Sequence, residues 1–237
     1  MNFNDYQRPS VAVDTVLFRC IDIDRGHRKG NGKELQVLLI KRKDEPFVNS
    51  WSLPGGFMSC ESGNLYDTAK NKLLEKTGIS NVYIEQLATF DMLNRDPRGR
   101  VLSVTYLGVT NEEKYTKNES YTHEAKWFSI KNNSLETENV ILNINELAFD
   151  HGTIIVEALN RLKNKIDYSD LAFYLLPEKF TIKEAQLLFE VVLGYRIDSF
   201  RRKLGKRVFE TEEFVQRVGK PAQLFVFNKD WKKEEFL

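Results

Sequence analysis

The chain has 237 residues, of which 41% are hydrophobic and 29% are charged, with a formal net charge of +1, so it holds enough apolar side chains for one large domain or two smaller ones, and we expect two. Residues 1–5 lack the basic start and apolar core of a signal peptide, and no apolar run approaches the roughly 20 residues that cross a bilayer, so we expect a cytoplasmic protein with no membrane partner. Cys20 and Cys60 are too few for a disulfide framework or a thiolate zinc site.

Two β-branched or apolar runs open the chain, at residues 10–18 and 35–40, and each predicts a strand. The Gly- and Arg-rich stretch between them, residues 25–33, is typical of a surface loop. After a Gly-Gly turn, residues 65–76 predict a helix that ends at Gly78, where a left-handed cap is expected.

Further strands are predicted at residues 82–90, 101–109 and 125–128. A helical pattern follows from residue 147 to about residue 162, with its apolar positions on one stripe. The pattern loosens after that helix, and we place a domain boundary there, with residues 1–165 as the first domain and residues 166–237 as the second.

The second domain carries the signals of a winged helix-turn-helix. Thr181 with Glu184 three residues later forms a capping-box pattern that opens a helix at residues 182–193, and Gly194 ends it. Asp198 can start a second, basic helix. Residues 208–214 and 222–227 then predict a β-hairpin. Helix, turn, basic helix and hairpin in this order indicate a DNA-binding unit.

Positive charge gathers in the second helix and its flanks, although the whole chain is almost neutral. Asp198 is the one acidic residue in this cluster, whose basic members are Arg196, Arg201, Arg202, Lys203, Lys206 and Arg207. Such clustering can supply phosphate contacts on one face.

Residues 53–57, Leu-Pro-Gly-Gly-Phe, and residues 75–79, Glu-Lys-Thr-Gly-Ile, resemble the two ends of a Nudix box. The usual box carries its carboxylates three and four residues apart on one helical face, where they hold magnesium. Counted back from Gly78, the corresponding positions here are Asn71, Lys72, Glu75 and Lys76. One carboxylate remains, so we expect no catalytic residues and no cofactor, and the box is degenerate.

Other interpretations of these residues stay open. Lys72 and Lys76 are suited to hold a pyrophosphate without metal, or they are simply solvated on a surface helix. Arg95, Arg98 and Arg100 surround a tight turn suited to phosphate or ribose recognition, which a solvated hairpin tip would also explain. His151 is better suited to capping or a buried hydrogen bond than to catalysis.

Taken together, the Nudix-like half, residues 147–151 with their helix, residues 175–181, residues 200–204 and residues 219–224 resemble the Nudix-related transcriptional regulators. The resemblance covers nearly the whole chain. It implies an α+β protein, a Nudix α/β/α sandwich with a mixed sheet followed by a C-terminal winged helix-turn-helix domain. It further implies a homodimer that represses transcription, binds double-stranded operator DNA, and takes ADP-ribose or a pentose such as arabinose as effector.

The resemblance also assigns residues to each site. The implied effector pocket holds Gly55, Gly56, Phe57, Lys72, Glu75, Lys76, Arg95, Arg98 and Arg100. The implied DNA contacts are Ser199, Arg201, Arg202, Lys203, Lys206, Arg207 and Lys220. Two alternatives remain: an active, ADP-ribose pyrophosphatase-like Nudix hydrolase of nucleoside diphosphate derivatives, with Mg²⁺ held by Glu61 and Glu75, and a sensor that acts through protein partners.

Overall fold

A computed structural model describes residues 6–24, 31–59, 63–111, 123–216 and 220–231. The chain forms two compact units. The first comprises Met1–Arg19 with Gln36–Arg161, and the second comprises Cys20–Leu35 with Leu162–Leu237. None of the helices within the described ranges has an apolar stretch long enough to cross a membrane.

A mixed sheet forms the centre of the first unit, in the order β5-β6-β1-β2-β7-β8-β9. Strands β1 and β6 run parallel, whereas the pairs β1–β4, β2–β3, β2–β7, β5–β6, β7–β8 and β8–β9 are antiparallel. Short strands β3 and β4 pair with β2 and β1 at one end. The bounds are β1 Ser10–Asp24, β2 Asn31–Lys41, β3 Trp51–Ser52, β4 Gly55–Phe57, β5 Tyr83–Phe90, β6 Val101–Thr110, β7 Ala125–Lys131, β8 Ser134–Thr137 and β9 Val140–Asn143.

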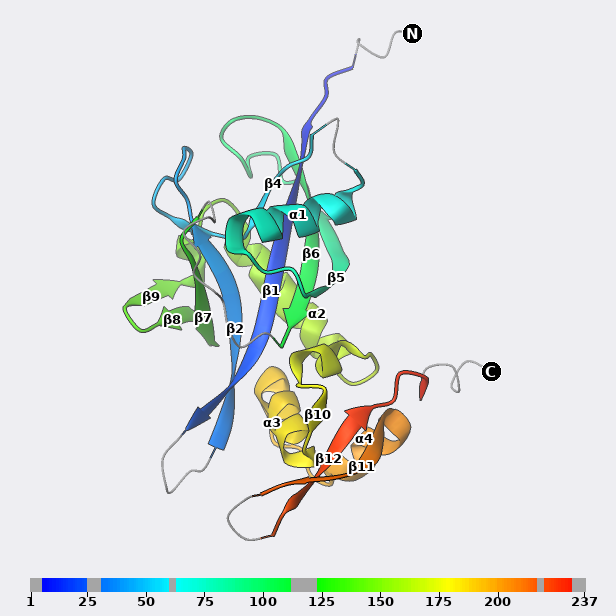
Figure 1. The fold of residues 1–237 in the computed structure, drawn as a ribbon. Coiled ribbons are helices and arrows are strands. Elements are labelled where there is room, and N and C mark those ends of the chain that lie inside the picture. The colour runs from blue at the N-terminus through cyan, green and yellow to red at the C-terminus, as the bar shows by residue number, and fades with distance from the viewer. Residues whose placement is uncertain (1–5, 25–30, 60–62, 112–122, 217–219, 232–237) are drawn as a thin grey trace. The chain divides into compact units, whose positions relative to one another are not determined.

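Two helices cover the sheet, with α1 (Leu65–Thr77) in front of β1 and α2 (His151–Lys165) behind it in Figure 1. The side chain of Asn64 caps α1 by accepting from the amide of Asp67, and Gly78 ends the helix at φ 77°. The predicted left-handed cap and the predicted sandwich are therefore confirmed.

Helix α1 packs on the sheet through one narrow apolar stripe. Leu73, which is 1% exposed, packs in a cluster with Leu17, Leu38 and Trp127. Ala69 packs with Val13 in a second cluster. The rest of the helix is left to solvent or to the pocket described below, because a helix packed on a sheet buries only one side.

The second unit contains the predicted helices and hairpin. Its elements after α2 are η3 (Leu171–Leu175), β10 (Lys179–Phe180), α3 (Ile182–Leu193), α4 (Phe200–Leu204), η4 (Gly205–Arg207), β11 (Val208–Val215) and β12 (Ala222–Phe227). The three strands form a sheet in the order β10-β12-β11. Thr181 and Glu184 make the predicted capping box, and Gly194 ends α3 at φ 82°.

Several predicted bounds were wrong. Helix α2 begins at His151 because Phe149, at φ 56°, interrupts the helical backbone before it. Strand β2 begins at Asn31, so residues 31–33 of the predicted surface loop belong to the sheet, while residues 25–30 lie outside the described residues. Helix α4 begins at Phe200, because Ser199 adopts a left-handed conformation with φ 53° in front of it.

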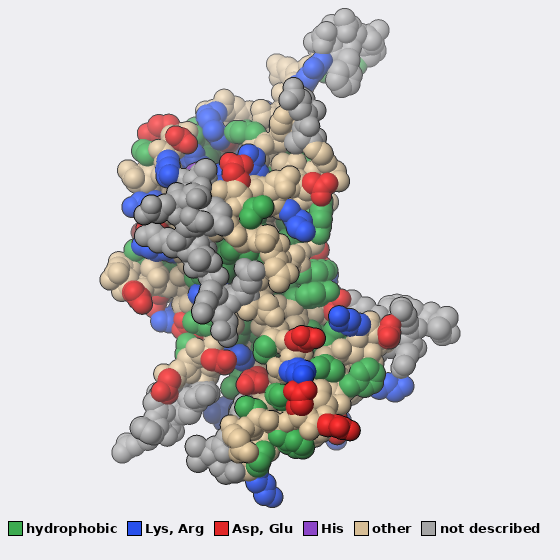
Figure 2. Space-filling model, viewed as in Figure 1, with side chains coloured by type: hydrophobic (Ala, Val, Ile, Leu, Met, Phe, Trp, Pro, Cys, Tyr) green, Lys and Arg blue, Asp and Glu red, His purple; other side chains and the backbone are tan. Residues whose placement is uncertain are grey.

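The surface of the C-terminal unit is mixed in charge. Figure 2 shows acidic and basic side chains next to one another over this unit, with apolar side chains between them. Two members of the basic cluster predicted from the sequence are paired with carboxylates from other segments of the chain, Arg201 with Glu210 and Lys203 with Asp167.

Candidate functional site

A cavity of about 330 Å³ opens in the first unit beside β4, the second half of α1 and the turn at residues 95–98. Eight of the nine predicted effector residues line it, namely Gly55, Gly56, Phe57, Lys72, Glu75, Lys76, Arg95 and Arg98. Asn71 is exposed outside the cavity, and Glu61 lies outside the described residues. The ninth, Arg100, does not line the cavity, and its guanidinium donates to the backbone oxygen of Asp91 at 2.6 Å.

The glycine turn brings the chain against β1. Gly55 pairs with Asp14 in the sheet, and a Cβ atom there would lie 2.2 Å from Asp14 Oδ1 and 2.3 Å from Val13 O. At Gly56 a Cβ atom would lie 3.1 Å from Lys72 Cδ. Glycine is therefore required at position 55, while the aliphatic stem of Lys72 covers position 56.

Helix α1 presents a cationic face to the cavity. Lys72 Nζ lies 2.8 Å from Glu75 Oε2 in an ion pair one turn along the helix. Lys76 lies on the next turn, and burial lowers the pKa of its ammonium, an effect that the carboxylate of Asp14 partly offsets. In the part of the chain that the structure describes, the side-chain ammonium of Lys76 has no hydrogen bond or ion pair.

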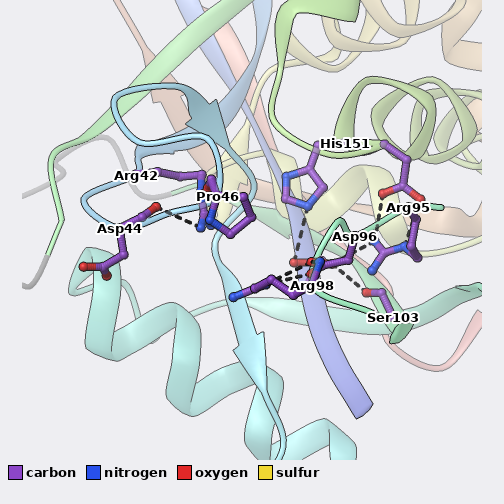
Figure 3. A network of polar contacts seen from close by, with 10 residues as sticks. Arg42, Asp44, Pro46, Arg95, Asp96, Arg98, Ser103 and His151 are labelled. Carbon is purple, nitrogen blue, oxygen red and sulfur yellow. Dashed lines mark hydrogen bonds and ion pairs between the residues drawn. The ribbon is translucent and has the colours of Figure 1, made fainter. Parts of the chain in front are cut away.

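The turn at residues 95–98 is held by two arginine–carboxylate pairs (Figure 3). Arg95 donates to both oxygens of Asp150, at 3.0 and 2.8 Å, and lies 3.6 Å from Asp14 Oδ2. Arg98 donates to both oxygens of Asp96, at 2.9 and 2.7 Å. The hydrogen bond from Arg98 lowers the pKa of Asp96. Arg95 is 7% exposed, so it orders the floor of the cavity, whereas the exposed Arg98 faces its opening.

His151 supports the same floor from the first turn of α2. Its Nδ1 accepts a hydrogen bond from the amide of Leu53 at 2.9 Å, and its Nε2 lies 3.7 Å from Asp14 Oδ1. Because Nδ1 accepts from this amide, the ring proton lies on Nε2, and burial lowers the pKa of His151. Asp14 also accepts from Ser103 Oγ at 2.6 Å. The buried hydrogen-bonding role predicted for His151 is confirmed.

Aromatic rings and guanidinium groups make one wall of the cavity. Arg42 lies 4.8 Å from the ring of Phe149, and Arg98 lies 5.0 Å from the ring of Phe57 and 5.8 Å from that of Phe149. Arg42 is fixed by donating to Pro46 O at 2.7 Å. Flat cationic and aromatic faces of this kind suit a planar or anionic ligand.

The donor set does not fit a resident magnesium ion. Magnesium takes hard oxygen ligands in octahedral geometry, chiefly carboxylates and water. Glu75 is the one carboxylate among the described α1 residues that line the cavity, and it is paired with Lys72. Within the described ranges, no group of three or more His, Cys, Asp or Glu side chains is arranged to hold a metal ion.

The predicted effector site left out several residues that line the cavity: Asp14, Arg42, Asp96, His123, Phe149 and His151. His123 is half-buried, and burial lowers its pKa to about 4. These residues come from β1, from four loops and from the start of α2, so only the fold brings them together. A signal was available for Asp14, because an acidic residue within an apolar strand is uncommon unless it is paired.

In the second unit, most of the predicted DNA contacts are exposed. Ser199 precedes α4, Arg202 lies on it, and Lys206 and Lys220 follow it in the chain. Arg201 forms an ion pair with Glu210 of β11 and lies 4.4 Å from the ring of Phe225. Lys203 forms a second ion pair, with Asp167 at 2.8 Å. Two cations of the cluster, Arg201 and Lys203, are therefore already paired with carboxylates.

Arg207 is the clear exception, and its predicted phosphate contact was wrong. The side chain is buried, and its guanidinium donates to the backbone oxygens of Asp167 at 3.0 Å, Ile166 at 3.4 Å and Ser169. The rings of Phe173 and Trp231 each lie 4.9 Å from it. Arg207 therefore fastens residues 166–169, which follow α2, to the winged helix of the same unit.

The fold and the site define a Nudix domain joined to a winged helix. Residues 20–143 match the NUDIX domain family, and residues 172–227 match the NrtR DNA-binding winged helix domain family. The chain belongs to the Nudix-related transcriptional regulators of the NrtR type.

Relatives of two kinds are similar to this chain. The ADPR responsive transcriptional repressor NtrR of Acinetobacter baylyi is 35% identical, over 94% of this chain and 84% of its own. The ADP-ribose pyrophosphatase of Methanocaldococcus jannaschii is 31% identical, over 67% of this chain and 78% of its own.

Solved structures also match over nearly the whole chain, among them the following two. The structure of Shewanella oneidensis NrtR complexed with a 27mer DNA has a TM-score of 0.72 and 31% identity, and the match covers 93% of this chain and 94% of that one. A MutT/nudix family protein from Enterococcus faecalis has a TM-score of 0.75 and 30% identity, and the match covers 96% of this chain and 90% of that one.

Proposed function

We propose that the protein is a transcriptional repressor that binds operator DNA through its winged helix and binds ADP-ribose in its Nudix pocket. The observation that carries the proposal is the presence, in one chain, of a cavity lined by cations and a winged helix with exposed basic side chains. Similarity to a repressor named as ADPR responsive, and to an NrtR solved with DNA, supports both halves. Such a protein acts in the cytoplasm and, on a palindromic operator, as a homodimer.

The pocket favours ADP-ribose over a free pentose. Its volume of about 330 Å³ lies in the range of pockets that take drug-sized ligands. Arg98 at the opening and Lys76 on α1 supply positive charge that a neutral sugar would not use. A diphosphate between two ribosyl groups would use it, and its adenine ring has a flat face for the wall around Phe57.

The proposed domains are residues 1–165, which bind the effector, and residues 166–237, which bind DNA. Effector binding represses or releases transcription only if it favours one arrangement of the two domains over another. The mechanism is then a population shift in the spacing of the DNA-binding elements on the operator.

For DNA we propose contacts from Ser199, Arg201, Arg202, Lys203, Lys206 and Lys220. Arg202 is the strongest of these, because its exposed guanidinium has no ion pair or side-chain hydrogen bond within the described residues. Arg201 and Lys203 must exchange Glu210 and Asp167 for phosphate oxygens, which reduces what they contribute.

We further propose that the pocket binds its effector without cleaving it. The cationic face of α1 does not fit the magnesium that hydrolysis of a pyrophosphate uses. The second candidate is an active Nudix hydrolase of nucleoside diphosphate derivatives, and the similarity to an ADP-ribose pyrophosphatase favours it. Incubation with ADP-ribose and Mg²⁺ or Mn²⁺ decides between them: turnover that Glu75→Gln abolishes supports the hydrolase.

Fluorescence anisotropy with DNA from upstream of the gene tests the repressor. We expect nanomolar, salt-sensitive binding to a specific site, and a change in that binding when ADP-ribose is added but not when ribose is added. A complete absence of specific binding at every upstream site would refute the DNA-binding half. Specific binding that responds to ribose alone would refute ADP-ribose as effector.

A further inference from the structure

We propose that Lys76 takes the position of a metal ion in this pocket, so that the diphosphate of the effector is bound by a fixed ammonium and no divalent cation is needed. The inference rests on the proposed function for the identity of the effector. It adds the chemistry by which the effector is held and the ionic conditions under which the receptor works.

The partners of the other cavity cations single out Lys76. Lys72 is paired with Glu75, Arg95 with Asp150 and Arg98 with Asp96. Arg42 donates to two backbone oxygens. Lys43 and Lys76 have no hydrogen bond or ion pair among the described residues, and of these two Lys43 is exposed while Lys76 is half-buried.

A half-buried ammonium without a hydrogen-bond acceptor is costly, because it has lost part of its hydration. Burial accordingly lowers the pKa of Lys76, and it outweighs the attraction of Asp14 and Glu75, which raises that pKa. Those two carboxylates have other partners: Asp14 accepts from Ser103 at 2.6 Å, and Glu75 accepts from Lys72 at 2.8 Å. A phosphate oxygen entering the cavity would supply the acceptor that Lys76 lacks.

The same arrangement opposes a divalent cation. An ion placed against the cavity face of α1 would meet Lys76 on one turn and Lys72 on the turn before it, with Glu75 as the one carboxylate between them. Like charges at contact distance repel even where water screens them. The residues that would have to coordinate the ion therefore exclude it, and their positive charge is directed at the ligand.

The charges of the cavity match a dianion more closely than a monoanion. Arg98 lies at the opening, half-exposed, and keeps donors beyond those it gives to Asp96. Lys76 lines the same cavity from the last turn of α1. Two cations from separate elements thus face one cavity, and a diphosphate places one negative charge on each of its two phosphoryl groups.

The test measures ADP-ribose binding to the full chain by isothermal titration calorimetry, in EDTA and again in millimolar Mg²⁺. We expect dissociation constants that agree within about twofold between the two buffers. Lys76→Gln should weaken binding about tenfold or more in both buffers, since a charge-assisted hydrogen bond is lost. The matched control Lys70→Gln changes a lysine of the same helix that does not line the cavity, and it should bind within about twofold of the parent protein.

Two further variants separate charge from folding. Lys76→Arg keeps a cation and should retain most of the affinity without metal. Lys76→Glu places a carboxylate beside Glu75, so its binding should be weak in EDTA and should recover when Mg²⁺ or Mn²⁺ is added. Thermal melting of each variant shows whether the Nudix unit is folded.

The inference is overturned if the parent protein binds ADP-ribose only when Mg²⁺ is present, or if a folded Lys76→Gln keeps full affinity in EDTA. In either case ADP-ribose could still alter DNA binding, and the proposed function would stand. No binding of ADP-ribose in either buffer would instead refute the proposed effector. The two failures are therefore distinguishable by one pair of titrations.

Discussion

Replacing Arg207 tests whether the buried member of the basic cluster supports the fold or touches DNA. In Arg207→Met, three hydrogen bonds to the backbone oxygens of Ile166, Asp167 and Ser169 are lost. The substitution leaves a flexible apolar side chain of similar length among the surrounding rings. The substitution removes the charge and keeps most of the packing volume. The decrease in the free energy of unfolding therefore measures what the guanidinium contributes to stability.

The magnitude follows from those contacts. A hydrogen bond from a charged group contributes about 1.5–3 kcal/mol, so three of them set an upper range of about 4–9 kcal/mol. Methionine recovers part of this by burying apolar surface among Phe173 and Trp231. We expect a net loss of about 3–5 kcal/mol in the free energy of unfolding of the winged helix.

Differential scanning fluorimetry and urea unfolding measure this loss. For a unit of this size we expect the melting temperature of the C-terminal transition to fall by about 10 °C or more. Lys206→Met is the matched control, because Lys206 is the exposed neighbour and its substitution should leave that temperature almost unchanged. The reasoning fails if Arg207→Met melts like the parent protein and loses DNA affinity with a reduced salt dependence, since that result is the signature of a phosphate contact.

Three other predictions use the same geometry. Arg202→Ala should weaken operator binding and lower the slope of log K against log salt by about one unit, with the melting temperature unchanged; an unaltered slope would exclude a phosphate contact. Gly55→Ala should prevent stable folding of the Nudix unit, because its Cβ atom would lie 2.2 Å from a carboxylate oxygen. Gly56→Ala should fold, because its Cβ atom meets only the flexible stem of Lys72 at 3.1 Å. Equal melting temperatures for the two variants would contradict this prediction. Burial lowers the pKa of His151 and lowers that of His123 to about 4. Because the unfolded chain takes up these protons below about pH 6.5, the stability of the Nudix unit should be full above that pH and should be lost as the pH falls toward the folded values. His123→Gln should flatten the pH dependence of the urea midpoint between pH 7 and 5, and an unchanged curve would show that His123 does not contribute.

Local signals in the sequence predicted the regular elements well. The capping box at Thr181 and the terminating Gly194 fixed both ends of α3, and Gly78 fixed the end of α1. These signals act over three or four residues, so a single sequence carries them. The interruption before α2 was missed, because nothing in the residue type of Phe149 announces a positive φ.

The cavity could be predicted only in part. The glycine turn and the box on α1 are contiguous in the chain, and their spacing identified Gly55 and Lys76 directly. Asp14 was missed because it reaches the cavity through the long-range pairing of β1 with β4, which no local pattern specifies. Clustered charge also could not separate Arg202, which is exposed, from Arg207, which is buried.

A receptor and a hydrolase need opposite properties from the same pocket. A hydrolase must stabilise the transition state of cleavage and activate water, for which a metal ion is suited. A receptor must bind the intact ligand, because the occupancy of DNA changes only when the ligand binds one conformation of the protein more tightly than the other. Moving that conformational equilibrium from 1:99 to 99:1 takes a preference of about 10⁴ in affinity. A fixed ammonium such as Lys76 adds to ground-state affinity and activates no water. Its position on α1 therefore gives a physical reason why this Nudix pocket should report the concentration of its ligand and leave the ligand intact.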